Sequence, residues 1–205
     1  WFDEGDNQNH NKGMLSILEI QKAIKDLNYN DPIMKKDPLK VRMGLNSGDV
    51  ILCDIGAAKA RVDLTMIGDA VNIAARLETA CSQYFIDNLV SDSVAKDAHG
   101  QFSIRIIDRI KVYGKDTPVA VYEIINEVES ASQEENDLIE NFEKGFEAYT
   151  KGKFSAGLKH FQKSKPLEID RGYPSTPSDV YISRCKMLEK SPPDNWDGTW
   201  TLESK

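Results

Sequence analysis

The stretch from Arg61 to Glu78 constrains the fold of this chain more than any other segment. Val62 and Leu64 alternate with polar neighbours, which is typical of a short half-buried strand. Gly68-Asp69 interrupts that alternation. The residues that follow predict a helix with an apolar side formed by Val71, Ala74, Ala75 and Leu77. The sequence therefore predicts a strand that turns abruptly into a helix, and such junctions often carry functional residues.

Asn72 and Arg76 are four residues apart, so they share one face near the start of the predicted helix. A guanidinium offers a fixed fork of donors to phosphate oxygens, and an amide can both donate and accept. The pair is therefore suited to reading a sugar and a phosphate. The same spacing is also typical of a solvated helix face, and spacing alone leaves that alternative open. Flanking small residues such as Ala70 and Ala74 favour binding, because they let a large ligand approach closely.

Three motifs resemble, in the same order, those of class III nucleotidyl cyclases. The central one is D-L-T-M-I-G-D-A-V-N-I-A-A-R-L-E at residues 63–78, which resembles the family signature. The upstream one, R-M-G-L-N-S-G-D-V-I-L-C-D-I-G at residues 42–56, resembles a glycine-marked strand pair. The last, D-R-I-K-V-Y-G-K-D-T-P-V-A-V-Y-E-I at residues 108–124, resembles the closing hairpin. The resemblance implies a cyclase domain at residues 1–127 with a ferredoxin-like core that lacks its first strands.

The family converts a nucleoside triphosphate into a 3′,5′-cyclic monophosphate and pyrophosphate. By resemblance, Asn72 is the asparagine that orients the ribose, and Arg76 is the arginine that stabilises charge at the α-phosphate. Thr65 stands at a base-reading position where threonine points to ATP. The resemblance therefore implies an adenylate cyclase that makes cyclic AMP for signalling, with a guanylate cyclase as an open alternative.

The family's divalent ions, two Mg²⁺ or Mn²⁺, are expected at two aspartates that precede Trp1. A base-selecting lysine is expected there too. Asp49, Asp54, Asp63 and Asp69 are not expected to replace those aspartates, and Asp69 suits the positive end of a helix.

The family's phosphate-binding lysine aligns with Tyr113, so we expect a neighbouring lysine to take its role. Of Lys111 and Lys115, Lys115 is the better candidate. Cys53 also departs from the family, because it stands where a glycine is common.

Family sites form between two cyclase domains, so the resemblance implies a homodimer with a two-fold axis. One subunit supplies the metal ligands, and the other supplies the asparagine and the arginine. This chain carries only the second half, so we expect it to be inactive alone. The open alternative is a non-catalytic module that binds nucleotide or dimerises while its C-terminal helices recruit a partner.

Charge and cysteine content exclude several classes of protein. The net charge of −7 argues against a general nucleic-acid surface. Three dispersed cysteines predict free thiols in a cytosolic protein rather than a disulfide framework. No apolar run is long enough to cross a bilayer, and the histidines have no metal-ligand spacing. The chain begins without Met, so we expect a piece of a longer protein whose cytoplasmic part can be tethered to a membrane.

The remaining pattern of the first 127 residues predicts an α/β fold with helices on one face of a sheet. Trp1-Phe2 resembles a strand end, and residues 3–13 predict a loop without the pattern of a calcium site. An amphipathic helix at 14–27 has an apolar row of Ile17, Ile20, Ile24 and Leu27, from which Leu18 is left out. The predicted strands are 41–45 and 50–55, joined by a turn at 46–49, then one ending at Val90, and a hairpin of 102–112 with 119–125. A helix capped by Ser91 is predicted after Val90.

Residues 128–205 predict a linker followed by a helical tail. The first helix carries a stripe of Leu138, Phe142, Phe146 and Tyr149 and ends at Gly152. The second ends before Pro166, and the third begins at Thr176-Pro177. The first two resemble a single tetratricopeptide unit, which must pack on something because one unit is not a stable solenoid. Trp196 and Trp200 are expected to dock on these helices or on the cyclase domain.

Overall fold

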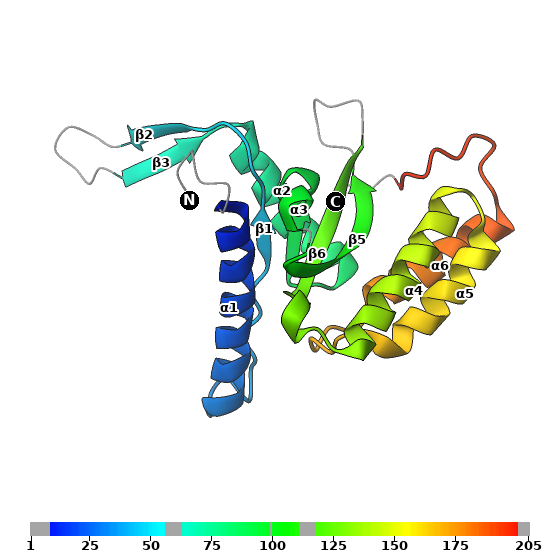
Figure 1. Cartoon of the computed structure of the whole chain (residues 1–205), viewed down its shortest axis with the longest axis horizontal. Helices are drawn as coiled ribbons and strands as arrows, with labels where there is room; N and C mark the ends of the chain where they lie inside the picture. Colours follow the sequence, from blue (N-terminus) through cyan, green and yellow to red (C-terminus); the bar gives the residue numbers. More distant parts are fainter. Residues whose placement is uncertain (1–8, 56–62, 99, 111–117, 201–205) are drawn as a thin grey trace.

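The computed structural model describes residues 9–55, 63–98, 100–110 and 118–200 (Figure 1). The helices are α1 (Asn9–Asn30), α2 (Asp69–Tyr84), α3 (Asp92–Ala95), α4 (Gln133–Thr150), α5 (Phe154–Ser164) and α6 (Pro177–Lys190). The strands are β1 (Met43–Leu45), β2 (Ile51–Ile55), β3 (Asp63–Ile67), β4 (Asn88–Ser91), β5 (Phe102–Ile110) and β6 (Val119–Glu127). Short 3₁₀ turns lie at Lys96–Ala98, Val128–Ser130 and Lys165–Leu167. The mixed α/β fold is confirmed.

Four strands form one sheet in the order β1-β4-β6-β5, and β2 and β3 form a separate ribbon. β1 runs parallel to β4, whereas β4, β6 and β5 are antiparallel neighbours. The predicted hairpin of 41–45 with 50–55 is therefore wrong, because β1 pairs with β4 and β2 pairs with β3. Alternation locates a strand but does not name its partner. The predicted hairpin of the last two strands is confirmed over the described residues.

Helices cover both faces of the sheet, not one. On β4, the neighbours Leu89 and Val90 point to opposite faces. Leu89 belongs to a core cluster with α2, α4, α5 and α6, and Val90 belongs to a second cluster with α1 and α3. Every residue of β4 is buried as a result. The sequence prediction missed this because a four-residue strand is too short to reveal two-sided burial by its pattern.

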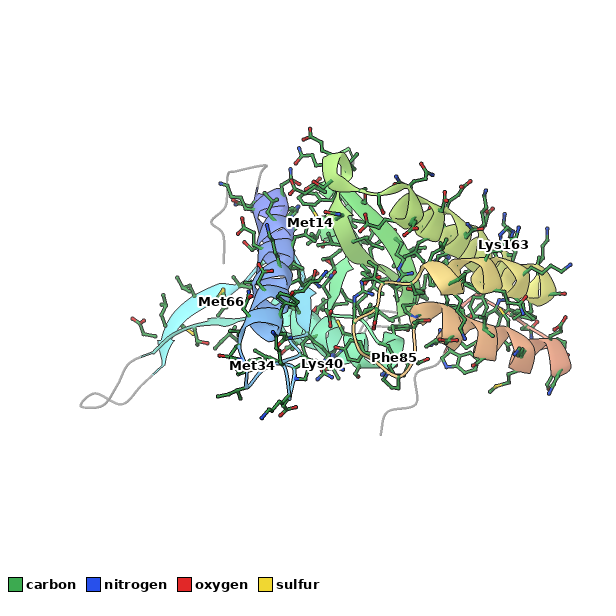
Figure 2. The ribbon with its side chains drawn as sticks, turned by 90° about the horizontal axis from the view of Figure 1, so that it is seen from below. Met14, Met34, Lys40, Met66, Phe85 and Lys163 are labelled. Atoms are coloured by element: carbon green, nitrogen blue, oxygen red, sulfur yellow. The ribbon has the colours of Figure 1, made fainter. Side chains whose placement is uncertain are left out.

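α1 is longer than predicted and includes residues 9–13, which the sequence assigned to a loop. Met14 and Ile17 pack into the second core cluster, and Figure 2 shows Met14 on the side of α1 that faces the sheet. Leu18, which the prediction left out, also packs against that cluster. Ile20 and Leu27 of the predicted row are instead 44% and 41% exposed. The helix therefore buries only its first half within this chain.

The first two helices of the tail end, and the third begins, close to the predicted positions. The whole predicted stripe on α4 is buried, and Thr176 caps α6 by accepting a hydrogen bond from the Asp179 amide. The tail packs directly on the sheet, because its aromatic residues share one core cluster with Ile107 of β5 and Leu77 of α2. We call residues 133–200 the helical tail.

The two tryptophans dock as expected, and Trp196 anchors the end of the helical tail. Its indole nitrogen donates to the Tyr149 carbonyl at 2.9 Å, and its ring meets those of Tyr149 and Phe154 edge-on. Trp200 lies over the Arg184 guanidinium at 5.0 Å.

Other predictions are corrected in detail or fall outside the described residues. Ser91 precedes α3, yet its hydroxyl pairs with that of Ser93 at 2.8 Å and does not cap the helix. Cys53, Cys81 and Cys185 are free, as predicted. None of the helices in the described part of the chain has the length and apolar character to cross a bilayer. The predicted strand end at Trp1-Phe2 and the turns at 56–59 and 114–116 lie outside the described residues.

Candidate functional site on helix α2

The central segment folds as the predicted strand, turn and helix. β3 ends at Ile67, Gly68 precedes the helix, and Asp69 lies in its first turn. A Cβ on Gly68 would lie 2.9 Å from the Asp49 carbonyl oxygen, so only glycine fits this crossing. Asp69 stands at the positive end of the helix dipole, as predicted. Close packing therefore explains the glycine at this junction, and the helix dipole explains the aspartate.

Asn72 and Arg76 are both exposed on α2, one turn apart. Neither side chain is absorbed into the core, so the helix presents an amide and a guanidinium on its outer side. The Asn72 side chain is exposed, so its amide donor and acceptor can reach a ligand.

The buried side of α2 differs from the prediction. Leu77 is buried together with Ala80, Cys81 and Tyr84, whereas Ala75 is exposed. The apolar side therefore lies toward the C-terminal half of the helix, which packs on the sheet. Burial raises the pKa of the Cys81 thiol to about 12, so this cysteine is neutral at physiological pH.

The upstream glycine-rich segment fixes α2 in place. A Cβ on Gly44 would lie 2.0 Å from the Ala74 carbonyl oxygen, so glycine lets β1 contact the middle of α2. The Asn46 side chain donates to the Ala70 carbonyl at 3.1 Å, and a Cβ on Gly48 would meet that of Ala70 at 3.0 Å. Asn46 lies between Gly44 and Gly48 of the upstream motif, and its sequence pattern predicted only a turn residue.

Thr65 lies on β3, where it pairs with Cys53 of β2 and is half-buried. Thr65 therefore lies on the strand that leads into α2, three residues before Gly68. Lys115, Lys111 and Tyr113 lie outside the described residues. The structure therefore relates three of the four predicted site residues through one strand-to-helix unit.

The described residues do not fit a metal centre. Among them, no three His, Cys, Asp or Glu side chains gather where they could hold an ion. The candidate site offers the Asn72 amide and the Arg76 guanidinium of α2 and the Thr65 hydroxyl of β3.

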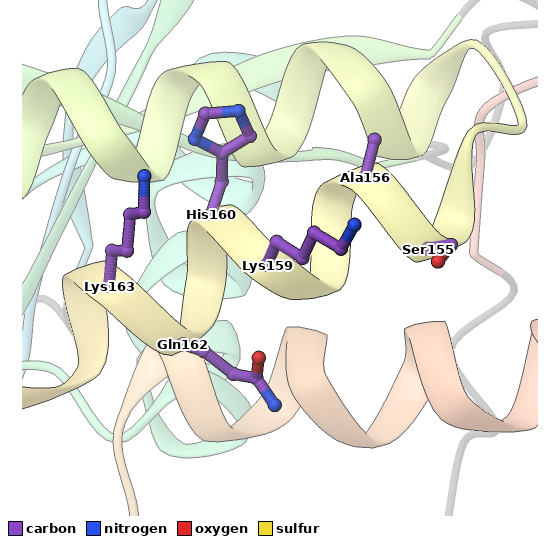
Figure 3. Close-up of a pocket in the computed structure, with 6 residues that line it drawn as sticks. All are labelled: Ser155, Ala156, Lys159, His160, Gln162 and Lys163. Atoms are coloured by element: carbon purple, nitrogen blue, oxygen red, sulfur yellow. The ribbon is translucent and has the colours of Figure 1, made fainter.

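A groove on α5 is separate from this site (Figure 3). Its lining residues all come from α5, and none comes from α2 or β3; they are Ser155, Ala156, Lys159, His160, Gln162 and Lys163. The groove is open and shallow and offers none of the predicted site residues. It is therefore distinct from the predicted site on α2 and β3.

Residues 5–126 match the sequence profile of the adenylate and guanylate cyclase catalytic domain. The chain belongs to this family. Over 89 residues, 42% of this chain and 18% of the relative, it is 38% identical to an adenylate cyclase of Anabaena cylindrica. Over 148 residues, 70% of this chain and 7% of the relative, it is 28% identical to the terminal-differentiation-specific adenylate cyclase of Dictyostelium discoideum. This cyclase-family chain therefore spans less than a fifth of either relative.

A solved structure gives the same picture of the fold. The crystal structure of the adenylyl cyclase CyaB from P. aeruginosa superposes with a TM-score of 0.52 at 25% identity. The match covers 63% of this chain and 65% of that one. The sheet and its helices are therefore those of a cyclase catalytic domain.

Proposed function

We propose that the protein containing this chain is an adenylate cyclase, which converts ATP into 3′,5′-cyclic AMP and pyrophosphate for cytoplasmic signalling. The observation that carries the proposal is the exposed pair Asn72 and Arg76, one turn apart on α2 of a cyclase-family domain. The two relatives and CyaB are all named adenylate or adenylyl cyclases, which supports ATP as the substrate.

In the proposed reaction, the ribose 3′-hydroxyl loses its proton and attacks the α-phosphorus in line, and pyrophosphate leaves. Asn72 would hold the ribose so that the hydroxyl faces the phosphorus, which removes orientational freedom before the reaction. Arg76 would donate to the α-phosphate oxygens, where negative charge builds in the transition state. Metal ligands are expected outside the described residues, so these roles concern the side chains of this chain alone.

Base selection is assigned to Thr65. Its hydroxyl can donate to and accept from the edge of a base, and its place on β3 puts it ahead of the α2 pair. Lys115 is proposed to contact the β- and γ-phosphates, a role that stays a sequence prediction.

The exposed apolar side chains of the ribbon favour a homodimer. Ile51, Leu52, Leu64 and Ile67 are between 44% and 70% exposed, although they lie on an isolated pair of strands. A two-stranded ribbon is marginal in water, and apolar patches of this kind mark protein contacts. We therefore propose that a second copy covers the ribbon across a two-fold axis, with each site completed by both protomers.

The test is a cyclic AMP assay with ATP and Mg²⁺ or Mn²⁺ on the longer protein that contains this chain. Arg76→Ala is expected to lower kcat by about 100- to 1,000-fold, or about 2.7–4 kcal/mol, as for loss of one donor to a developing anion. Gln83→Ala is the matched control, because Gln83 is exposed on the same helix about 10 Å farther along its axis.

Three outcomes would contradict parts of the proposal. Equal turnover in Arg76→Ala and Gln83→Ala would remove the catalytic role of Arg76. A preference for GTP over ATP in a competition assay would make the protein a guanylate cyclase. Monomeric behaviour without nucleotide binding would favour a fragment or a scaffold that neither catalyses nor binds nucleotide.

A further inference from the structure

The C-terminal end of α2 is fastened to the helical tail by a buried polar contact. Tyr84, the last residue of α2, donates its hydroxyl to Asp108 Oδ2 of β5 at 2.6 Å. Arg184 of α6 donates to the same oxygen at 2.7 Å, and its guanidinium lies 5.5 Å from the Tyr84 ring centre. All three side chains are buried, so water does not replace these contacts.

The residues just after α2 meet the tail at a second place. Phe85 has a left-handed backbone with φ 60°, a conformation that non-glycine residues keep only where their surroundings hold them. Its ring contacts that of Tyr173, in the connection between α5 and α6, and Figure 2 shows Phe85 where the sheet domain meets the tail. The Tyr173 hydroxyl also donates to Asp87 at 2.9 Å.

The connection that carries Tyr173 is itself anchored to the sheet. Arg105 of β5 is fully buried and donates to Glu123 of β6 at 2.7 Å. The same guanidinium forms two parallel hydrogen bonds, of 3.0 and 2.8 Å, with Glu168 of the connection. Arg171 forms an ion pair with Glu123 from the other side. The tail is therefore a fixed support rather than a loose appendage.

These contacts bear on the site because α2 is one rigid helix. Its 16 residues extend over about 24 Å, with Asn72 and Arg76 in the first half and Tyr84 at the end. A tilt at the end is transmitted to the start.

We propose that the helical tail is a positioning element of the catalytic unit: Arg184 and Asp108 hold Tyr84, and through α2 they set the placement of Asn72 and Arg76. This proposal rests on the proposed adenylate cyclase function. Tyr84 and Arg184 are positioning residues, because they act through α2 and do not touch the nucleotide.

The experiment compares Tyr84→Phe with Tyr181→Phe in the longer protein. Tyr84→Phe removes only the hydroxyl that ties α2 to Asp108, and leaves the Arg184–Asp108 pair intact. Tyr181→Phe is the matched control, because it removes an equally buried hydroxyl whose hydrogen bond, to the Ile107 carbonyl at 2.7 Å, joins α6 to β5 and not to α2. Each variant loses one buried hydrogen bond, so we expect the two to lose similar stability. A difference in kcat between them then reports on the contact with α2.

We expect Tyr84→Phe, but not Tyr181→Phe, to lower kcat with little change in KM for ATP. The loss is expected to be about 10- to 100-fold, because a misplacement of about 1 Å costs up to about 100-fold. In the Arg76→Ala background, Tyr84→Phe is expected to lower kcat by a smaller factor, since only the placement of Asn72 is then left to disturb. Amide hydrogen exchange is expected to speed up at residues 72–76 as well as at the end of α2.

Equal losses of kcat in the two Tyr→Phe variants, or the same factor in both Arg76 backgrounds, would overturn the positioning role. Faster exchange confined to residues 80–84 would overturn it as well. If the unmodified protein makes no cyclic AMP, or if Arg76→Ala is fully active, the proposed function fails instead. Hydrogen exchange then still decides whether the tail controls α2.

Discussion

The two edges of the sheet differ in how they are covered. At one edge, β5 is mostly buried beside the helical tail, and its buried charged residues, Arg105 and Asp108, form ion pairs within the chain. At the other edge, all three residues of β1 are half-buried, and the ribbon of β2 and β3 projects from this side (Figure 1). The ribbon and the second half of α1 leave large apolar side chains exposed. The difference shows that the β5 edge is covered by residues of this chain, whereas the β1 edge leaves apolar surface that suits a contact with another protein surface.

The largest expected effect tests the completeness of the β5 edge. Arg105→Met leaves the buried Glu168 side chain without its cation and Glu123 with Arg171 alone, so the free energy of unfolding is expected to fall by about 3–5 kcal/mol. Coulombic attraction to these carboxylates outweighs the burial of Arg105 and raises its pKa, in agreement with a charged network. Urea unfolding followed by circular dichroism measures the change.

The matched control for Arg105→Met is Lys144→Met, which breaks the exposed pair with Glu140 on α4. A surface pair of this kind contributes at most about 1 kcal/mol. If the two variants lost similar stability, the buried network would not distinguish the β5 edge.

The fall of the free energy of unfolding at alkaline pH tests how tightly the buried side of the molecule is packed. Burial raises the pKa of Cys81 and of Cys185 from 9.0 to about 12 each, so the folded chain holds these protons more tightly than the unfolded chain. The free energy of unfolding is therefore expected to be unaffected by them below pH 9 and to fall as the pH rises from 9 toward 12. Each thiol contributes up to about 1.4 kcal/mol per pH unit to that slope.

Urea unfolding between pH 8 and 10.5 measures this slope. Cys185→Ala, in the helical tail, is expected to make it shallower, whatever the variant does to stability at pH 8. A slope that stayed the same would show that this thiol is not buried in solution, and the tail would then be less tightly packed than the structure indicates.

The smallest effect on the stability of one chain is expected at the ribbon. Ile67→Ser changes a side chain that is 52% exposed, so the free energy of unfolding of the monomer is expected to change by about 0.5 kcal/mol or less. Association of two chains is expected to weaken, because the apolar patch on the ribbon becomes smaller. Sedimentation over a concentration series measures both species.

Met187→Ser is the matched control for the ribbon, because Met187 is 58% exposed on α6 of the tail. It is expected to leave association unchanged. If both variants associated equally well, the ribbon would not be the contact that completes the β1 edge.

The sequence alone determined the local elements of this protein. The break at Gly68-Asp69, the one-turn spacing of Asn72 and Arg76, the stripe on α4 and the cap at Thr176 all depend on residues close together in the chain. Periodicity and capping are local properties, so the strand-to-helix junction and the tail helices were predicted close to their observed positions.

Only the tertiary structure decided which strands pair and which charged residues are buried. β1 pairs with β4, more than 40 residues away, and its pairing depends on how close α2 can come over Gly44. Arg105, Glu123 and Glu168 are distant in sequence and would ordinarily be exposed, so no local pattern indicates that they share one buried site. Strand partners and buried ion pairs are set by contacts between distant segments, and a single sequence does not encode such contacts in any local pattern.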